Sequence, residues 1–326
     1  MNIPAAYVIA NFGGPRCLDE VTSFLTALLT DQEVLRTSLP ACVHRWLFSY
    51  VAKCRAKTIS KEYKKMGGGS PIFADTEAIA QSLRCKVQAP ILTFHRYLPS
   101  THQAFIDELE KLPCGEIRVF PMFPQFTYAT TGSIASFFAK NLSIKLQQRL
   151  RWIKSYPAHS SYINVMRHML KQYMVTQQLK EQESVFLFSS HGLPLSFIAT
   201  GDLYLSECQA TFQAIMQDFP GVLGKLCFQS KFGPGEWIRP YTIDCCEQVL
   251  NWHQGRKNVI FVPMSFTSDH IETLCEIEDQ YMPVIEKQGL KALRLPAMNQ
   301  HEEWIEAIHL ILHEVTTVSN QMLLRH

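Results

Sequence analysis

The sequence lacks a long apolar run. No uninterrupted apolar stretch approaches the roughly 20 residues that a membrane-spanning helix needs. The first residues, MNIPAAYVIANFGGP, hold neither a basic segment nor an apolar segment of the length found in signal peptides. We therefore expect a cytoplasmic protein with no transmembrane segment, and a peripheral membrane contact stays open.

An excess of one charge is also missing. The formal net charge is +2 and no long basic run occurs, so nothing favours a nucleic-acid partner. With 47% hydrophobic and 18% charged residues, the 326-residue chain has the composition of a globular protein with a sizeable core. At about 150 residues per domain, this length predicts two domains or one large one.

Several short motifs are absent. None of the ten cysteines forms a C-x-x-C pair or a zinc-like His/Cys cluster, which favours reduced thiols over a disulfide framework. Cys208 and Cys275 fall inside predicted helices, where inert buried thiols are expected. G-x-S-x-G is missing, and neither Asn11–Pro15 nor GGGSP at 67–71 fits a nucleotide-binding loop. We therefore expect no NAD, no ATP and no tightly bound cofactor.

The chain does contain a regular alternation of strands and helices. Short apolar runs end in turns and precede stretches of helical periodicity, which is typical of βαβ units and parallel sheets. The expected strands are 5–10, 89–94, 117–122, 150–156, 184–189, 224–229, 257–263 and 290–295. The expected helices include 19–29, 43–66, 76–83, 100–112, 202–218, 241–253, 271–287 and 301–314.

The two halves of the chain resemble each other. Segments 119–134 and 260–274 both combine a strand ending near Pro-Met with an aromatic residue, a Ser/Thr turn and a helix. His95 and His191 both stand at strand ends ahead of a proline. We predict an α/β fold with two similar Rossmann-like domains, each a mainly parallel sheet flanked by helices, with a cleft between them.

The predicted domain boundaries are 1–155 and 156–326. An arrangement in which the C-terminal helix packs back on the first domain stays open.

The segment 188–196, FSSHGLPLS, is the most informative stretch. A buried strand ends at His191, and Gly192 and Pro194 turn the chain at once. An imidazole is thereby placed at the carboxyl end of a sheet, where open α/β folds bind their ligands. It can hold a borderline metal or accept a proton, and a purely structural histidine is the alternative.

The segment 258–278 has the same design. A strand ends at Pro263, the turn carries Asp269 and His270, and a helix opens with Glu272. Asp269 or Ser268 is a candidate helix N-cap, and His270 and Asp269 are candidates to seat the turn. We expect the scaffold to bring the imidazole and the Glu272 carboxylate to opposite sides of one pocket.

One face of the helix 271–287 is acidic. With α-helical spacing, Glu272, Glu276 and Asp279 share this face, while Ile277 and Tyr281 belong to a separate apolar face. A solvated surface explains the pattern on spacing alone. The alternative is a carboxylate ladder that conducts a cation inward or protons outward.

Aromatic residues are frequent at strand ends and in loops. Such positions suggest a pocket for a large planar apolar molecule, with Arg55 and Arg96 available for carboxylates at its rim. The aromatic residues concerned are Phe12, Tyr63, Tyr97, Phe126, Tyr128, Trp237 and Phe266.

Taken together, these stretches resemble the ferrochelatase family, whose members insert ferrous iron into a porphyrin at the end of haem synthesis. The matching segments, in order, are NFGGPRCLDEV, EYKKMGGGSPI, HRY, FPQFTYATTGS, FSSHGLPLSFIATGD, CFQSKFGPGEWIRP and VPMSFTSDHIETLCEIE. The resemblance implies a lyase that makes protohaem from protoporphyrin IX and releases two protons. Ferrous iron is then a substrate and the porphyrin lies in the cleft.

The resemblance also implies roles for individual residues. His191 and Glu272 become the catalytic and metal-site pair, and which one takes protons and which holds metal stays open. Glu276 and Asp279 become an acidic path. The implied porphyrin-binding residues are Phe12, Arg55, Tyr63, Ser70, Arg96, Tyr97, Tyr204, Trp237 and Phe266.

One of the chain's departures from some relatives concerns a cofactor. Those relatives carry a C-terminal cysteine cluster that binds iron–sulfur, whereas no cysteine follows Cys275 here, so we expect no such cluster. Two alternatives stay open: a chelatase for another tetrapyrrole such as coproporphyrin, and a non-catalytic tetrapyrrole or metal carrier. A monomer is expected rather than a dimer.

Overall fold

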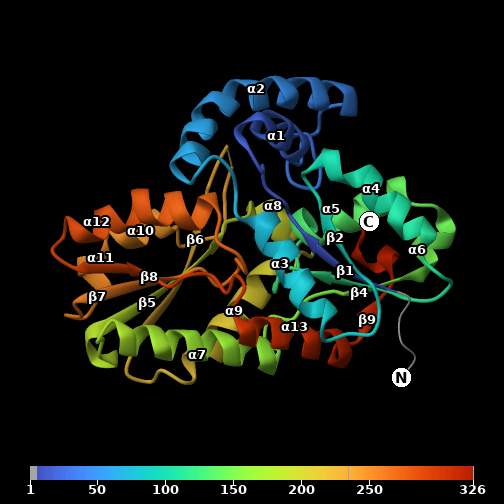
Figure 1. Ribbon diagram of the computed structural model, residues 1–326. Helices are drawn as coiled ribbons and strands as arrows, with labels where there is room; N and C mark the ends of the chain where they lie inside the picture. Colours follow the sequence, from blue (N-terminus) through green and yellow to red (C-terminus); the bar gives the residue numbers. More distant parts are fainter. Residues whose placement is uncertain (1–5, 234, 326) are drawn as a thin grey trace. The chain divides into compact units, whose positions relative to one another are not determined.

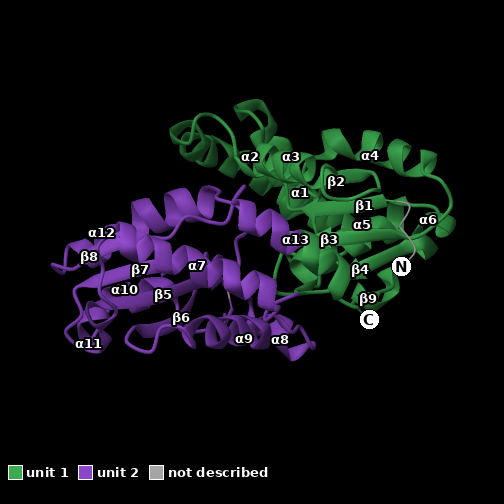
Figure 2. Cartoon of the chain, turned by 60° about the horizontal axis from the view of Figure 1, so that its bottom comes forward, with its two compact units in different colours: residues 1–155, 309–326 green, residues 156–308 purple. Residues whose placement is uncertain are grey.

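The computed structural model describes residues 6–233 and 235–325 (Figure 1). The chain divides into two compact units, coloured separately in Figure 2. Unit 1 comprises residues 1–155 and 309–326, and unit 2 comprises residues 156–308. Helix α13 (Glu302–Glu314) contains the boundary between them.

Unit 1 is built on a five-stranded sheet. Its elements are β1 (Ala6–Asn11), η1 (Leu18–Glu20), α1 (Val21–Leu29), α2 (Ala41–Lys65), α3 (Ile72–Arg84), β2 (Ile91–His95), α4 (Pro99–Lys111), β3 (Ile117–Pro121), η2 (Tyr128–Gly132), α5 (Ser133–Asn141), α6 (Ile144–Arg149), β4 (Leu150–Ile153), β9 (Thr317–Val318) and η5 (Asn320–Leu323). The strand order is β2-β1-β3-β4-β9, with only β9 antiparallel to its neighbour. The rings of Phe94, Phe138 and Trp152 form part of its core.

Unit 2 is built on a four-stranded, all-parallel sheet. Its elements are α7 (Ser160–Thr176), η3 (Glu181–Glu183), β5 (Ser184–His191), α8 (Leu195–Ala199), α9 (Tyr204–Met216), β6 (Leu223–Gln229), α10 (Thr242–Glu247), α11 (Val249–Trp252), β7 (Asn258–Val262), η4 (Glu272–Tyr281), α12 (Met282–Glu286) and β8 (Lys291–Arg294). The strand order is β6-β5-β7-β8. Central β5 is buried almost throughout, as its near-continuous apolar run predicts for a parallel strand covered on both faces.

The two sheets share one strand order. In each, the first strand of the unit lies between the second and the third, and the fourth follows the third. Strands β3 and β7 are each followed by a π-helix, η2 and η4. The register, however, pairs His191 with Gln229 and Asn11 with His95. The counterpart of His191 in unit 1 is therefore Asn11 and not the histidine at 95.

The predicted alternation of strands and helices is confirmed, with local differences. The short elements α6, α8 and β9 were not predicted. The helix expected over 241–253 is interrupted because Gln248 leaves the helical region, with φ −100° and ψ 17°. The helix expected over 271–287 begins as the π-helix η4 before it continues as α12.

In the residues that the structure describes, no helix has both the length and the apolar composition that crossing a membrane requires.

Candidate active site

The first side chain of the candidate site belongs to the end of β5. His191 is the last residue of this strand and lies opposite Gln229 of β6. Because β6 and β7 flank β5, the imidazole emerges where the strand order reverses, at the usual ligand position of such sheets. The residues before it are buried, so a shift of register would expose them and is disfavoured.

The turn after His191 is held by backbone hydrogen bonds. The N–H of Gly192 donates to the carbonyl of Gln229 at 2.8 Å, and the N–H of Ile238 donates to the carbonyl of Leu193 at 2.9 Å. A Cβ atom at position 192 would stand only 2.9 Å from the Gln229 oxygen. Glycine is required for this close approach, and the turn fixes the direction in which the imidazole leaves the sheet.

The second side chain is carried by η4, the π-helix that follows β7. In a π-helix hydrogen bonds join residues five apart, and such turns occur frequently at functional sites. The hydroxyl of Tyr281 accordingly donates to the carboxylate of Glu276. The α-helical spacing assumed from the sequence was wrong here, because it assigned Tyr281 to a face away from the acidic residues. Asp279 is exposed, whereas Glu276 is half-buried, and a role for Asp279 in an acidic path stays a prediction.

His191 and Glu272 are in direct contact. Nδ1 of His191 and Oε2 of Glu272 are 2.8 Å apart, and about a third of each side chain is exposed (32% and 27%). The prediction that they occupy opposite sides of a pocket was wrong. His191 ends β5, and Glu272 opens η4 after the neighbouring strand β7, which lies about 4.8 Å from β5.

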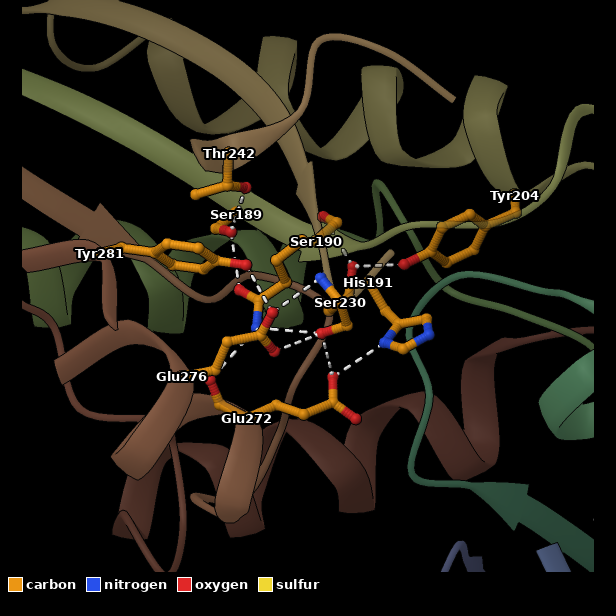
Figure 3. Close-up of polar contacts among 11 residues, drawn as sticks. Ser189, Ser190, His191, Tyr204, Ser230, Thr242, Glu272, Glu276 and Tyr281 are labelled. Carbon is orange, nitrogen blue, oxygen red and sulfur yellow. Dashed lines mark hydrogen bonds and ion pairs between the residues drawn. The ribbon is translucent and has the colours of Figure 1, made fainter. Parts of the chain in front are cut away.

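The contact leaves one ring nitrogen available. Figure 3 shows Nε2 of His191 on the side of the ring away from Glu272. No described residue hydrogen-bonds to this nitrogen. A carboxylate at Nδ1 favours the tautomer with a proton on Nδ1, which leaves the lone pair of the neutral ring on Nε2.

Ser230 connects the two carboxylates. Its φ of +62° is in the left-handed region, which is unfavourable for a residue with a Cβ atom. In this conformation its N–H donates to Oε1 of Glu276 at 2.8 Å, while its hydroxyl is 3.1 Å from Oε2 of Glu272 and 2.5 Å from Oε2 of Glu276. One hydroxyl proton serves one carboxylate at a time. Strain of this kind persists where the surroundings impose it, often at functional sites.

Within unit 2, a chain of polar side chains continues from Glu276 to Ser189 and Thr242 (Figure 3). Nε2 of Gln229 donates to Oε2 of Glu276 at 3.2 Å, and Oε1 of Gln229 accepts from the hydroxyl of Ser189 at 2.6 Å. Ser189 lies 2.9 Å from the hydroxyl of Thr242. These three partners are buried, so their satisfied hydrogen bonds hold Glu276 in place.

Burial and neighbouring charges shift the pKa values of His191, Glu272 and Glu276, and not all in the same direction. Burial acts to lower the pKa of His191, but the charge and hydrogen bond of Glu272 outweigh it and raise that pKa above its usual value. Burial acts to raise the pKa of Glu272, but the charge and hydrogen bond of His191 outweigh it and hold that pKa well below its usual range. Burial and the charge of Glu272 raise the pKa of Glu276. Neighbouring carboxyls whose pKa values move apart are suited to different roles.

In the turn before η4 the predicted N-cap is wrong, whereas the prediction that Asp269 helps to seat the turn is confirmed. No side chain caps the first turn of η4. The carboxylate of Asp269 instead accepts from Arg294 at 2.7 Å and from the hydroxyl of Thr273 at 2.9 Å. The ring of His270 packs against Phe266 with centroids 4.6 Å apart, and burial lowers the pKa of His270. The turn therefore places a neutral imidazole beside the pair.

In unit 1, predicted pocket residues gather around Asp31, which the sequence analysis missed. Oδ2 of Asp31 accepts from Arg96 at 2.7 Å, from the hydroxyl of Tyr97 at 2.9 Å and from the hydroxyl of Ser133 at 2.5 Å. The ring of Phe12 packs on that of Tyr97, with centroids 4.5 Å apart. The charge of Arg96 is thus already balanced within unit 1, and a ligand carboxylate would compete with Asp31 for it.

The other predicted pocket residues differ in exposure. Arg55 of α2 is exposed and Phe266 is half-buried. Phe126, expected at a pocket wall, packs in the core of unit 1. Which of the predicted residues line one pocket stays a prediction, because they belong to both units. Those that are buried are Tyr63, Ser70, Tyr204 and Trp237.

Gln229 and Ser230 were also missed as site residues. The sequence analysis quoted their segment, CFQSKFGPGEWIRP, only as part of a resemblance. Their place directly at the end of a strand, like that of His191, was the available signal. Among residues 6–233 and 235–325, no group of three or more His, Cys, Asp or Glu side chains is arranged to hold a metal.

Comparison with known proteins decides the family. The ferrochelatase family model matches residues 4–316. The chain belongs to the ferrochelatase family. It is 40% identical to the ferrochelatase of Chlamydia caviae over 98% of this chain and 99% of that protein. It is 42% identical to the ferrochelatase of Chlamydia muridarum over 93% of this chain and 92% of that protein.

Solved structures support the fold of this ferrochelatase-family protein. CbiX, described as the terminal enzyme of sirohaem biosynthesis in denitrifying bacteria, aligns with a TM-score of 0.50 and 13% identity over 94% of this chain and 98% of that one. SirB from Bacillus subtilis with Fe3+ aligns with a TM-score of 0.53 and 11% identity over 98% and 99%. The predicted α/β fold with two mainly parallel sheets is confirmed.

Proposed function

We propose that this ferrochelatase-family protein inserts ferrous iron into protoporphyrin IX and releases two protons. The His191–Glu272 pair carries the proposal: an imidazole at the carboxyl end of β5, fixed by a carboxylate on Nδ1, with the Nε2 lone pair directed away from it. Iron and porphyrin are both substrates. Nothing in the proposed reaction requires a group that stays bound between turnovers.

The reaction exchanges two pyrrole protons for one divalent cation, so charge balances when both protons leave. We assign the acceptance of a pyrrole proton to Nε2 of His191. Glu272 stabilises the imidazolium that forms, because its carboxylate lies 2.8 Å from Nδ1. The imidazolium passes its Nδ1 proton to Glu272, and the hydroxyl of Ser230, which contacts both carboxylates, relays a proton on to Glu276, whose pKa is raised.

The same pair is the proposed contact for the metal. A single imidazole nitrogen, with the Glu272 carboxylate held on the other nitrogen of the ring, binds a borderline cation weakly enough to give it up to the porphyrin, whereas a thiolate cage would retain it. A proton and a metal compete for the one available lone pair. Metal binding therefore weakens as the pH falls through the pKa of His191.

An anaerobic assay tests the proposed function. Purified protein is mixed with ferrous iron and either protoporphyrin or coproporphyrin, and absorbance follows metalloporphyrin formation. We expect many turnovers, with the faster rate on protoporphyrin. Product formation that stops at one equivalent would support the carrier alternative, and a faster rate on coproporphyrin would assign that substrate instead.

The pH dependence of insertion follows from the pair. Turnover requires neutral His191, and Glu272 favours the protonated ring, so the rate should rise with pH through an apparent pKa above the ordinary value of about 6.5. In Glu272→Gln the charge is lost while burial still lowers the pKa of His191, so this rise should move to lower pH. Zinc insertion between about pH 5.5 and 9 measures both profiles. If the apparent pKa of the rate profile were the same in Glu272→Gln as in the wild type, the assignment of this pKa to His191 would be contradicted.

The same pKa shifts make the folding stability depend on pH. The raised pKa of His191 contributes stability that is present below about pH 6.5 and is lost as the pH rises through the folded-state value. The lowered pKa of Glu272 contributes stability that is present above about pH 4.3 and is lost as the pH falls through its folded-state value. The pair therefore supports the fold most strongly between these limits.

Two substitutions at Ser230 separate backbone strain from hydrogen bonding. Both Ser230→Ala and Ser230→Gly lose the hydroxyl, so we expect both to slow insertion to a similar degree. Only glycine relieves the left-handed strain of about 1–2 kcal/mol, at an entropic cost of about 0.5–1 kcal/mol. Urea unfolding should therefore show the glycine variant about 0.5–1 kcal/mol more stable than the alanine variant. Full activity in either variant would contradict a role for the hydroxyl.

A further inference from the structure

Three buried cysteines gather in the core of unit 2. Cys227 lies on β6, and Cys245 and Cys246 are consecutive residues of α10. All three are free thiols, and all three belong to one core cluster. The reaction assigned to His191 and Glu272 uses none of them, so it does not explain why thiols gather here.

The side chains of Cys227 and Cys245 meet between β6 and α10. The hydroxyl of Thr242 donates to Sγ of Cys227 at 3.2 Å, so this side of α10 covers β6. Cys245 follows three residues later on the same side of the helix, because residues three apart are neighbours on a helix surface. The two thiols are accordingly in hydrogen-bond contact. Cys246 projects about 100° away from Cys245 around the helix.

Hydrogen bonds fix α10 over β6. The N–H of Phe228, the residue after Cys227, donates to the carbonyl of Pro240 at 2.9 Å, just before the helix begins. At the other end, Nε1 of Trp252 donates to the carbonyl of Cys245 at 2.9 Å. The contact between the two thiols is therefore held by the backbone on both of its sides.

The two thiols differ in how readily they lose a proton. The hydrogen bond from Cys227, together with the charge of Lys225, outweighs burial and lowers the pKa of Cys245. Burial raises the pKa of Cys227 well above its usual value. Cys245 is 3% exposed and Cys227 is 0% exposed, so solvent reaches the more acidic thiol first. A thiolate with a second thiol beside it is the arrangement found in redox-sensing cysteines.

We propose that Cys245 and Cys227 form a dithiol that hydrogen peroxide closes to a disulfide, and that this disulfide slows metal insertion. The Cys245 thiolate attacks a peroxide oxygen, the O–O bond breaks, and the hydroxide that leaves takes up a proton to become water. Cys227 then attacks the sulfenic sulfur, the S–S bond forms, the S–O bond breaks, and a second water leaves. In total the two thiols lose two electrons and two protons, and a dithiol reductant reverses the change.

A chain of hydrogen bonds joins the dithiol to the candidate site. Oγ1 of Thr242 contacts both Sγ of Cys227 and the hydroxyl of Ser189, which is 2.9 Å away. Ser189 donates to Gln229, and Gln229 donates to Glu276. A disulfide brings two sulfur atoms within about 2 Å of each other, which draws Sγ of Cys227 away from Thr242. We expect insertion to slow about tenfold, as when a hydrogen bond that orients an active-site group is lost.

Peptide mapping of the full-length protein tests the disulfide. After treatment with hydrogen peroxide and alkylation of the remaining thiols, trypsin should release peptide 226–231 linked to peptide 232–256, and dithiothreitol should separate them. Cys245→Ser should lose the linked product, whereas Cys246→Ser, the matched control at the next residue, should keep it. Absence of the linked product from the wild type would overturn the proposal. The opposite pattern in the two variants would overturn it as well.

Zinc insertion before and after peroxide tests the effect on the rate, which rests on the proposed function. The wild type and Cys246→Ser should slow and should recover with dithiothreitol. Cys245→Ser and Cys227→Val should keep their rates, although both retain the exposed cysteines, which all belong to unit 1. An unchanged rate in the disulfide-containing wild type, or equal slowing of all variants, would overturn the proposed effect. Absence of insertion by the untreated protein would contradict the proposed function alone, because the linked peptides form without turnover.

Discussion

Replacing His191 with alanine is expected to abolish metal insertion. The variant loses Nε2, the nitrogen that is directed away from Glu272 and that we assign to proton acceptance and metal contact. Loss of a positioned acid–base group alone slows a reaction by about 10²–10⁴-fold, and loss of the metal contact adds to this. Steady-state zinc and iron insertion measures the effect. Porphyrin binding, followed by fluorescence quenching, should persist.

The control for this variant is His168→Ala. His168 is also in unit 2, but it pairs with Glu303 at the surface, far along the chain from the site segments. We expect it to turn over at the wild-type rate. Undiminished insertion by His191→Ala, with the fold intact by circular dichroism, would refute the assignment of this imidazole.

Replacing Glu272 with glutamine is expected to have the second-largest effect. The amide keeps the shape of the side chain, and it can still hydrogen-bond to Nδ1 of His191, but the negative charge is lost. The imidazolium formed in the reaction then lacks its counter-charge in a site where burial already disfavours it. We expect a loss of roughly 10²-fold or more in turnover, measured at a pH above the pKa of His191.

A matched control is Glu286→Gln on α12, which removes the same charge from an exposed position of the helix that continues η4. It should leave both turnover and the pH profile unchanged. If Glu272→Gln and Glu286→Gln behaved alike, the charge at the start of η4 would have no special part in the reaction.

Most of the fold could be predicted from the sequence because its helices and strands have strong local patterns. The run from Val185 to Phe188 is apolar, which predicted a buried strand, and these residues are buried in β5. The turn at Gly192 and Pro194 marked the strand end correctly. Parallel order followed from the alternation of strands and helices, since crossover connections of this kind leave few topologies. The short elements α6, α8 and β9 have too few residues for a period to show.

The contacts inside the site could be predicted less well from the sequence, for two physical reasons. Periodicity was assessed on α-helical spacing, so the contact between Glu276 and Tyr281, five residues apart, was assigned to different faces. Contacts between distant segments have no local pattern at all. Ser230 meets the two carboxylates only because β5, β6 and β7 are neighbours in the sheet. Adjacent strands also explain why His191 touches Glu272 instead of facing it across a slot.

The central claim is that His191 and Glu272 act as one unit in metal insertion. A double-mutant cycle measures this most directly, with kcat/KM for zinc and protoporphyrin determined for the wild type, His191→Ala, Glu272→Gln and the double variant. Groups that act through one another lose their effect together. The account predicts that the double variant is no slower than His191→Ala alone. Losses that multiply, as for two independent residues, would contradict it.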